Sequence, residues 1–243
     1  MVYLAITFTN KAAREMKERI AGLLDQEQAT AIWVSTFHAL SARILRRDSE
    51  KIGYGTSFSI LDPSAQKTLI KHVLNDLNYD SNQYEPKSIL AAISNFKNAL
   101  QTPKDAQREA QTVFDQAAAS AYDLYQKRLK LSQSMDFDDL IMKTIELFRQ
   151  APDVLHYYQR KFRYIHVDEY QDTNDAQYQM VKMLASGQAA WGNLAVVGDS
   201  DQSIYGWRGA DMNNILNFEK IFQVQNSHAG TELSVDQTYP AGS

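Results

Sequence analysis

Apolar residues change their spacing along the chain, and each change marks an expected element. Short apolar runs at residues 2–7 and 31–35 predict strands, and each is followed by residues with helical spacing, at 10–24 and 36–47. A strand that repeatedly gives way to a helix is typical of a parallel sheet covered by helices. The start of the chain therefore predicts an α/β domain.

A segment with helical character follows. Asp62-Pro63, Glu85-Pro86 and Thr102-Pro103 each place a polar residue before a proline, the order favoured at the start of a helix. The last of these helices is expected to run unbroken over residues 104–131. Because no convincing strand pattern occurs between 59 and 135, this stretch is predicted to be an all-helical domain inserted into the α/β domain.

The strand and helix alternation then resumes. The remaining expected elements are a helix at 136–148, a strand at 162–167, a helix at 174–185, a strand at 193–198, a helix at 211–222 and a possible strand at 232–235. The predicted organisation is an α/β domain made of residues 1–58 and 136–243, interrupted by the insert at 59–135.

Acidic residues follow two of the predicted strands. Asp168-Glu169 comes directly after the strand at 162–167, and Gly198-Asp199 follows the apolar run at 194–197. Ligands of open α/β sheets bind outside the carboxyl ends of the strands, so both acidic tips are expected to face one crevice. A nucleoside triphosphatase needs one carboxylate for Mg²⁺, which Asp168 would supply through water, and a general base, which Glu169 would supply. Gln202 adds a neutral polar group that could sense a γ-phosphate.

Aromatic residues also lie at strand ends. Phe8 stands before a basic helix, a place that suits base stacking and phosphate binding at a helix N-terminus. Tyr205 and Trp207 are two residues apart, so both can face one side of an extended segment, with Arg208 available for a phosphate. On spacing alone, core aromatic residues beside a surface arginine explain the same pattern.

Composition narrows the class of protein. The formal net charge is −4, yet residues 11–47 hold seven Lys and Arg against four acids, a local excess of three positive charges that suits phosphate contacts. The chain has no cysteine, which excludes disulfides and thiolate metal sites. No apolar run approaches the roughly 18 residues of a membrane span. The cytoplasm is the simplest expected compartment.

Five segments, in this order, resemble the motifs of one family. They are residues 7–16 (motif Ia), 35–38 (motif Ib), 136–141 (the Phe-Asp-Asp-Leu segment), 168–174 (motif II) and 198–210 (motif III). Together they resemble the superfamily 1 DNA helicases of the UvrD/Rep/PcrA type. The resemblance covers nearly the whole chain.

The resemblance implies a RecA-like domain 1A interrupted by a helical subdomain 1B. It also implies ATP- and Mg²⁺-dependent translocation in the 3′ to 5′ direction on single-stranded DNA and at DNA junctions. Asp168 would serve the metal, Glu169 would activate water and Gln202 would contact the γ-phosphate. The residues that the resemblance assigns to DNA are Phe8, Asn10, Lys11, Thr36, His38, Tyr205, Trp207 and Arg208.

Two departures from the family pattern bear on activity. No G-x-x-x-x-G-K-[ST] phosphate loop (Walker A segment) occurs in the sequence, and neither does the family's adenine-contacting glutamine segment. Pro240 also stands where the family has an arginine. The RecA-like domain is therefore expected to be incomplete, and self-association that covers the exposed edge of its sheet is a further expectation.

Two other functions fit parts of the same pattern. The chain could be a non-catalytic module that binds single-stranded DNA or protein through its basic and aromatic surface. It could also be a metal-dependent nuclease, since carboxylate clusters can hold two metal ions. The nuclease would use Asp168, Glu169, Asp172, Asp199 and Asp201, but no lysine lies beside them and the aromatic residues would have no role.

We predict that the 243-residue polypeptide alone hydrolyses ATP little. The backbone N–H groups and the lysine of a phosphate loop normally hold the phosphates, and no such loop occurs in this sequence. Phosphate release should be measured with and without single-stranded DNA. Turnover that DNA stimulates and that Glu169→Gln abolishes would contradict the prediction.

Overall fold

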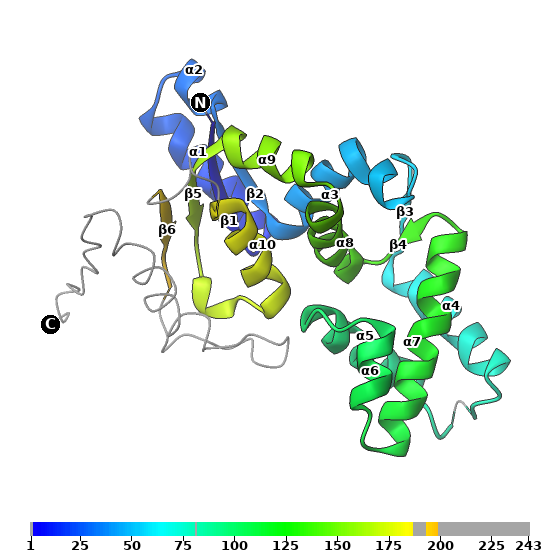
Figure 1. Cartoon of the computed structure of the whole chain (residues 1–243). Coiled ribbons are helices and arrows are strands. Elements are labelled where there is room, and N and C mark those ends of the chain that lie inside the picture. The colour runs from blue at the N-terminus through cyan, green and yellow to red at the C-terminus, as the bar shows by residue number, and fades with distance from the viewer. Residues whose placement is uncertain (1, 81, 187–192, 199–243) are drawn as a thin grey trace, which may run out of the picture.

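The computed structural model describes residues 2–80, 82–186 and 193–198. Within these ranges four strands form one sheet in the order β2-β1-β5-β6, and every neighbouring pair is parallel (Figure 1). The strands are β1 (Val2–Thr7), β2 (Ile32–Thr36), β5 (Phe162–Val167) and β6 (Leu194–Val196). This sheet confirms the predicted α/β class. The helix expected at 211–222 and the strand expected at 232–235 lie outside the described residues.

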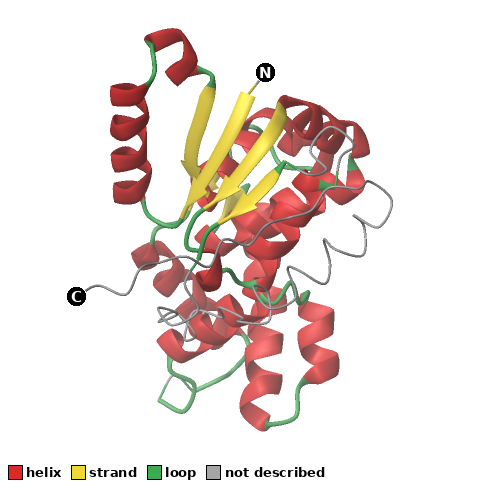
Figure 2. Cartoon of the chain, turned by 90° about the vertical axis from the view of Figure 1, so that its left-hand side faces the viewer, coloured by secondary structure: helices red, strands yellow, loops and turns green. Residues whose placement is uncertain are grey.

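The pairing register brings the ends of the strands level with one another. Thr7 pairs with Thr36, Ile6 with Val167, and Val167 with Val196. All four strands therefore finish at one edge, where their arrowheads lie together in Figure 2. We call this the carboxyl edge; it comprises the strand ends and the residues that directly follow them.

Helices cover both faces of this sheet. Alternate residues of a strand point to opposite faces. Ala5 accordingly packs with Ala13 of α1 (Asn10–Leu23), whereas Leu4 and Ile6 belong to the larger core on the other face. That larger core is built with α3 (Phe37–Asp48), the 3-10 helix η1 (Ser49–Ile52), α8 (Phe137–Gln150), α9 (Pro152–Lys161) and α10 (Asp175–Ala185).

Two helices beside the sheet, α2 (Gln26–Thr30) and α9, were not predicted from the apolar pattern. The short α2 precedes β2, and α9 begins at Pro152 directly after α8. The proline at the first position of α9 is the same signal that marks helices elsewhere in this chain. The start of α9 could therefore have been predicted from the sequence.

The insert has its own core. Its helices are α4 (Pro63–Asp76), α5 (Pro86–Asn98), α6 (Pro103–Glu109) and α7 (Val113–Leu131), and α4, α5 and α6 start at the prolines that predicted them. The buried apolar residues of this core all lie within residues 70–129, and none belongs to the core beside the sheet. The separate cores support the division at 59 and 135, which stays our proposal.

The prediction of one long helix at 104–131 was wrong. The chain becomes extended at Ala110, with ψ 117°, and Thr112 then caps a new helix. The Thr112 hydroxyl accepts from the Asp115 N–H at 3.1 Å, and the Asp115 carboxylate accepts from the Thr112 N–H at 2.9 Å. This reciprocal capping box satisfies two N–H groups and favours a helix start over continuation.

The prediction that 59–135 holds no strand was also wrong. Two-residue strands, β3 (Ser59–Ile60) and β4 (Ser134–Met135), pair in parallel at the two ends of this stretch. Two residues are too few to show a period of two, so the apolar pattern does not reveal them. Their pairing places the point where the chain leaves the α/β part beside the point where it returns.

We predict that Leu129→Ala destabilises the insert by about 2–5 kcal/mol, because it opens a cavity at a fully buried position. If the two cores are separate units, hydrogen exchange should rise across α4–α7 and stay unchanged in β1 and β5. Leu131→Ala is the matched control, since Leu131 lies on the same helix but is 85% exposed. Equal loss of protection in the sheet would contradict the proposed division.

Candidate functional site

The carboxyl edge gathers the candidate residues that precede position 199. Asp168 and Glu169 directly follow β5, Phe8 directly follows β1, and Thr36 ends β2. The Asp168 N–H donates to the Ile6 carbonyl at 2.9 Å, so the sheet ladder holds its backbone. Asp168 is half-buried and Glu169 is exposed. Two carboxylates of different exposure therefore stand side by side at this edge.

Glu169 adopts a backbone conformation that is uncommon outside glycine. Its φ is 52° and its ψ is 40°, in the left-handed region. Such positions cost about 1–3 kcal/mol and concentrate at functional sites. The turn leads into the 3-10 helix η2 (Tyr170–Asp172), and the Gln171 amide donates to the Glu169 carboxylate at 2.7 Å. The carboxylate is thus held next to the strand end.

The segment after β6 lies against this turn. The Val197 N–H donates to Val167 at 2.9 Å, and the Val197 carbonyl accepts from the Tyr170 N–H at 2.8 Å. A Cβ on Gly198 would stand 2.4 Å from the Gln171 side-chain oxygen and 3.1 and 3.2 Å from the backbone nitrogens of Gln171 and Tyr170. Only glycine fits there without a shift of backbone, so the ends of β5 and β6 are in direct contact.

The rest of motif II is tightly bonded. The Thr173 hydroxyl donates to the Tyr170 carbonyl at 2.7 Å, and Asn174 caps α10 in a capping box with Gln177. The Asn174 side chain also donates to the Asn98 side chain of α5 at 3.0 Å. The acidic turn is therefore joined to the insert through Asn174, the N-cap residue of α10.

The aromatic side of the edge starts at Phe8. Its ring packs edge-on against Phe37, with centroids 5.5 Å apart, and remains half-exposed. Thr9 caps α1 by accepting from the Ala12 N–H at 3.1 Å, which leaves Asn10 and Lys11 exposed on the first turn. Lys11 pairs only loosely with Glu15, at 3.8 Å.

A second aromatic pair lies after β2. His38 stacks on Phe137 with centroids 3.8 Å apart and planes 19° apart, and Phe137 is 53% exposed. Thr36 is buried and caps α3 by accepting from the Ala39 N–H at 3.2 Å, so its hydroxyl already has a structural role. The sequence analysis missed Phe137 as a candidate. An apolar residue between the acids Asp136 and Asp138 was the available signal.

The remaining candidates cannot be placed. Asp199, Asp201, Gln202, Tyr205, Trp207 and Arg208 lie outside the described residues. Their assignments stay predictions.

The described carboxylates suit Mg²⁺ chemically. Mg²⁺ takes oxygen ligands and usually keeps several waters, with one or two carboxylates and substrate phosphates. Asp168 is half-buried and directly follows β5 at the carboxyl edge. Within the described ranges no three His, Cys, Asp or Glu side chains gather as a metal-binding group, and no helix there is long and apolar enough to cross a membrane.

Comparison with known proteins identifies the family. The UvrD/REP helicase N-terminal domain matches residues 2–223. The chain is 61% identical over 236 residues to the ATP-dependent DNA helicase PcrA of Leuconostoc citreum, covering 97% of this chain and 30% of that protein. It is 58% identical over 224 residues to PcrA of Staphylococcus aureus, covering 92% and 30%. The chain thus spans about 30% of the length of these relatives, and it belongs to the UvrD/REP helicase family.

Proposed function

We propose that this chain is part of an ATP-dependent DNA helicase that moves 3′ to 5′ on single-stranded DNA, and that the 243 residues alone hydrolyse ATP little. The observation that carries the proposal is the carboxyl edge, where the Asp168-Glu169 turn and the aromatic residues lie at neighbouring strand ends. This edge occurs in a chain that is 61% identical to a protein named ATP-dependent DNA helicase PcrA. The cytoplasm as its compartment and self-association through a sheet edge are finer proposals.

On the nucleotide side, Asp168 would hold Mg²⁺ through water and Glu169 would act as general base. Bound Mg²⁺-ATP supplies the phosphoanhydride bond whose hydrolysis drives movement. The exposed Glu169 carboxylate can accept a proton from water, and the hydrogen bond from Gln171 keeps it oriented for that transfer. Gln202 is proposed to contact the γ-phosphate.

On the DNA side, the exposed rings would stack on bases and the first turn of α1 would meet phosphate. A stacked base contributes about 1–3 kcal/mol, whatever its identity, which suits translocation along any sequence. The proposed contacts are Phe8, Asn10, Lys11, Thr36, His38 and Phe137, with Tyr205, Trp207 and Arg208. Single-stranded DNA and its junctions with duplex DNA are the proposed partners.

Glu169→Gln should reduce ATP turnover by about 100-fold or more, because a general base contributes about 10²–10⁴-fold. The test uses a chimaera in which this chain replaces the matching 236 residues of the Leuconostoc helicase. Binding of single-stranded DNA should persist in the variant. Glu27→Gln, on exposed α2, is the matched control and should retain full turnover. Unchanged turnover in the Glu169 variant would remove the proposed base.

Phe137→Ala should weaken binding of single-stranded DNA to the 243-residue chain by about 5- to 150-fold, the equivalent of one lost stacking contact. Binding is measured by fluorescence anisotropy of a labelled oligonucleotide at low salt, and it should also weaken as salt rises. Phe114→Ala is the matched control, since Phe114 is 38% exposed on the insert. Equal effects of the two substitutions would argue against a stacking role.

A further inference from the structure

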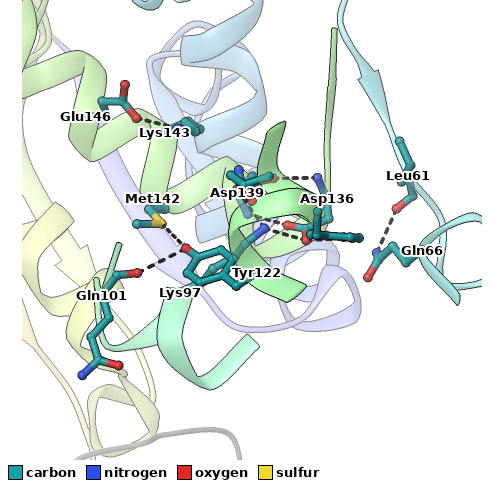
Figure 3. Close-up of polar contacts among 12 residues, drawn as sticks. Leu61, Gln66, Lys97, Gln101, Tyr122, Asp136, Asp139, Met142, Lys143 and Glu146 are labelled. Carbon is teal, nitrogen blue, oxygen red and sulfur yellow. Dashed lines mark hydrogen bonds and ion pairs between the residues drawn. The ribbon is translucent and has the colours of Figure 1, made fainter. Parts of the chain in front are cut away.

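A charged cluster is buried where the insert meets α8. The Lys97 ammonium lies 2.7 Å from Asp136 Oδ2 and 2.9 Å from Asp139 Oδ1 (Figure 3). The Lys97 side chain is 0% exposed, and those of Asp136 and Asp139 are 4% and 0% exposed. Lys97 comes from α5 of the insert, and the two aspartates open α8 of the α/β part.

The cluster is also bonded to α7. The Tyr125 hydroxyl donates to Asp136 at 3.1 Å, and the Gln126 amide donates to Asp139 at 2.7 Å. Both aspartates have a second role, because they form the capping box of α8 with each other's backbone N–H groups. Three helices from the two cores therefore meet at a single ammonium group.

Stability alone does not explain such a cluster. Burying charged groups is costly, since burial raises the pKa of Asp136 to about 7, and well-packed apolar residues often serve stability equally well. Burial opposes the Lys97 charge, but the two carboxylates outweigh it and raise the pKa of Lys97, which stays protonated. What a buried ion group does supply is a specified geometry, because only one arrangement pairs all of its members.

The residues next to the cluster connect it to the His38–Phe137 pair and to the acidic turn. Phe137 follows Asp136 in the chain, and its ring stacks on His38 at 3.8 Å. Fixing the first turn of α8 therefore fixes the exposed Phe137 ring and its stacking on the half-buried His38. On the other side, Asn98, the neighbour of Lys97, accepts from Asn174, which caps α10 five residues after Glu169.

We propose that Lys97 is a positioning residue, and that the Lys97-Asn98 turn of α5 couples the insert to the aromatic pair and to the acidic turn at once. The inference rests on the proposed function. A movement of the insert on DNA would then shift both the first turn of α8 and the N-cap of α10, because the Lys97-Asn98 turn is bonded to each of them. Lys97 itself touches neither substrate.

The test needs a variant that folds. Lys97→Met alone would leave two carboxylates buried without a cation, so the test variant combines Lys97→Met with Asp136→Asn and Asp139→Asn. Asparagine keeps a side-chain oxygen for the helix cap, and methionine fills the space of the lysine stem. Lys87→Met, on the exposed face of the same helix, is the matched control.

Two measurements separate this inference from the proposed function. In the chimaera, the triple variant should keep its melting temperature and its ATP turnover without DNA, while half-maximal stimulation should need at least tenfold more single-stranded DNA. In the 243-residue chain, the same variant should bind the oligonucleotide at least fivefold more weakly. Asn98→Ala should reduce maximal stimulation while leaving the affinity for DNA unchanged.

Stimulation and affinity like those of the Lys87→Met control would overturn the proposal, and so would a parallel fall of basal and stimulated turnover. If the parent chimaera does not hydrolyse ATP, the proposed function fails. The binding measurement on the 243-residue chain then still decides whether Lys97 positions the aromatic pair.

Discussion

Parallel pairing at a common register is the constraint on which the rest of the molecule depends. The bonds from Asp168 to Ile6 and from Val197 to Val167 extend the ladder beyond the last strand residues. Four chain segments therefore turn away from the sheet at the same level. Side chains that are 160 residues apart in sequence, such as Phe8 and Asp168, reach one edge only because the strands run in the same direction.

The edge is made from two kinds of local structure. The acidic side relies on an unusual backbone. Glu169 lies in the left-handed region, and Gly198 packs against the Tyr170–Gln171 turn that follows Glu169. The aromatic side relies on ordinary helix starts, where Phe37 and Phe137 each begin a helix. The strained turn fixes the Glu169 backbone, whereas the helix start at Phe137 leaves its ring 53% exposed.

The sequence allowed most of the elements to be predicted, whereas the predicted crevice shared by Asp168-Glu169 and Asp199 stays a prediction, because Asp199 lies outside the described residues. The apolar runs predicted the four strands of the sheet, and the prolines predicted α4, α5 and α6. The break before α7 was missed because residues 104–131 are compatible with a helix, whereas the capping box between Thr112 and Asp115 starts a new one. Lys97 could not be recognised, since its carboxylate partners lie 39 and 42 positions further along the chain and only the fold brings them together.

The β3–β4 pair has a consequence for the length of the insert. Because Ser59 and Ser134 are neighbours in parallel strands, the excursion between them begins and ends at almost the same point in space. The cost of closing such an excursion grows only slowly with its length. The α/β part can thus accept an insert of a different length or sequence at the β3–β4 pair, provided that the insert contacts the first turn of α8.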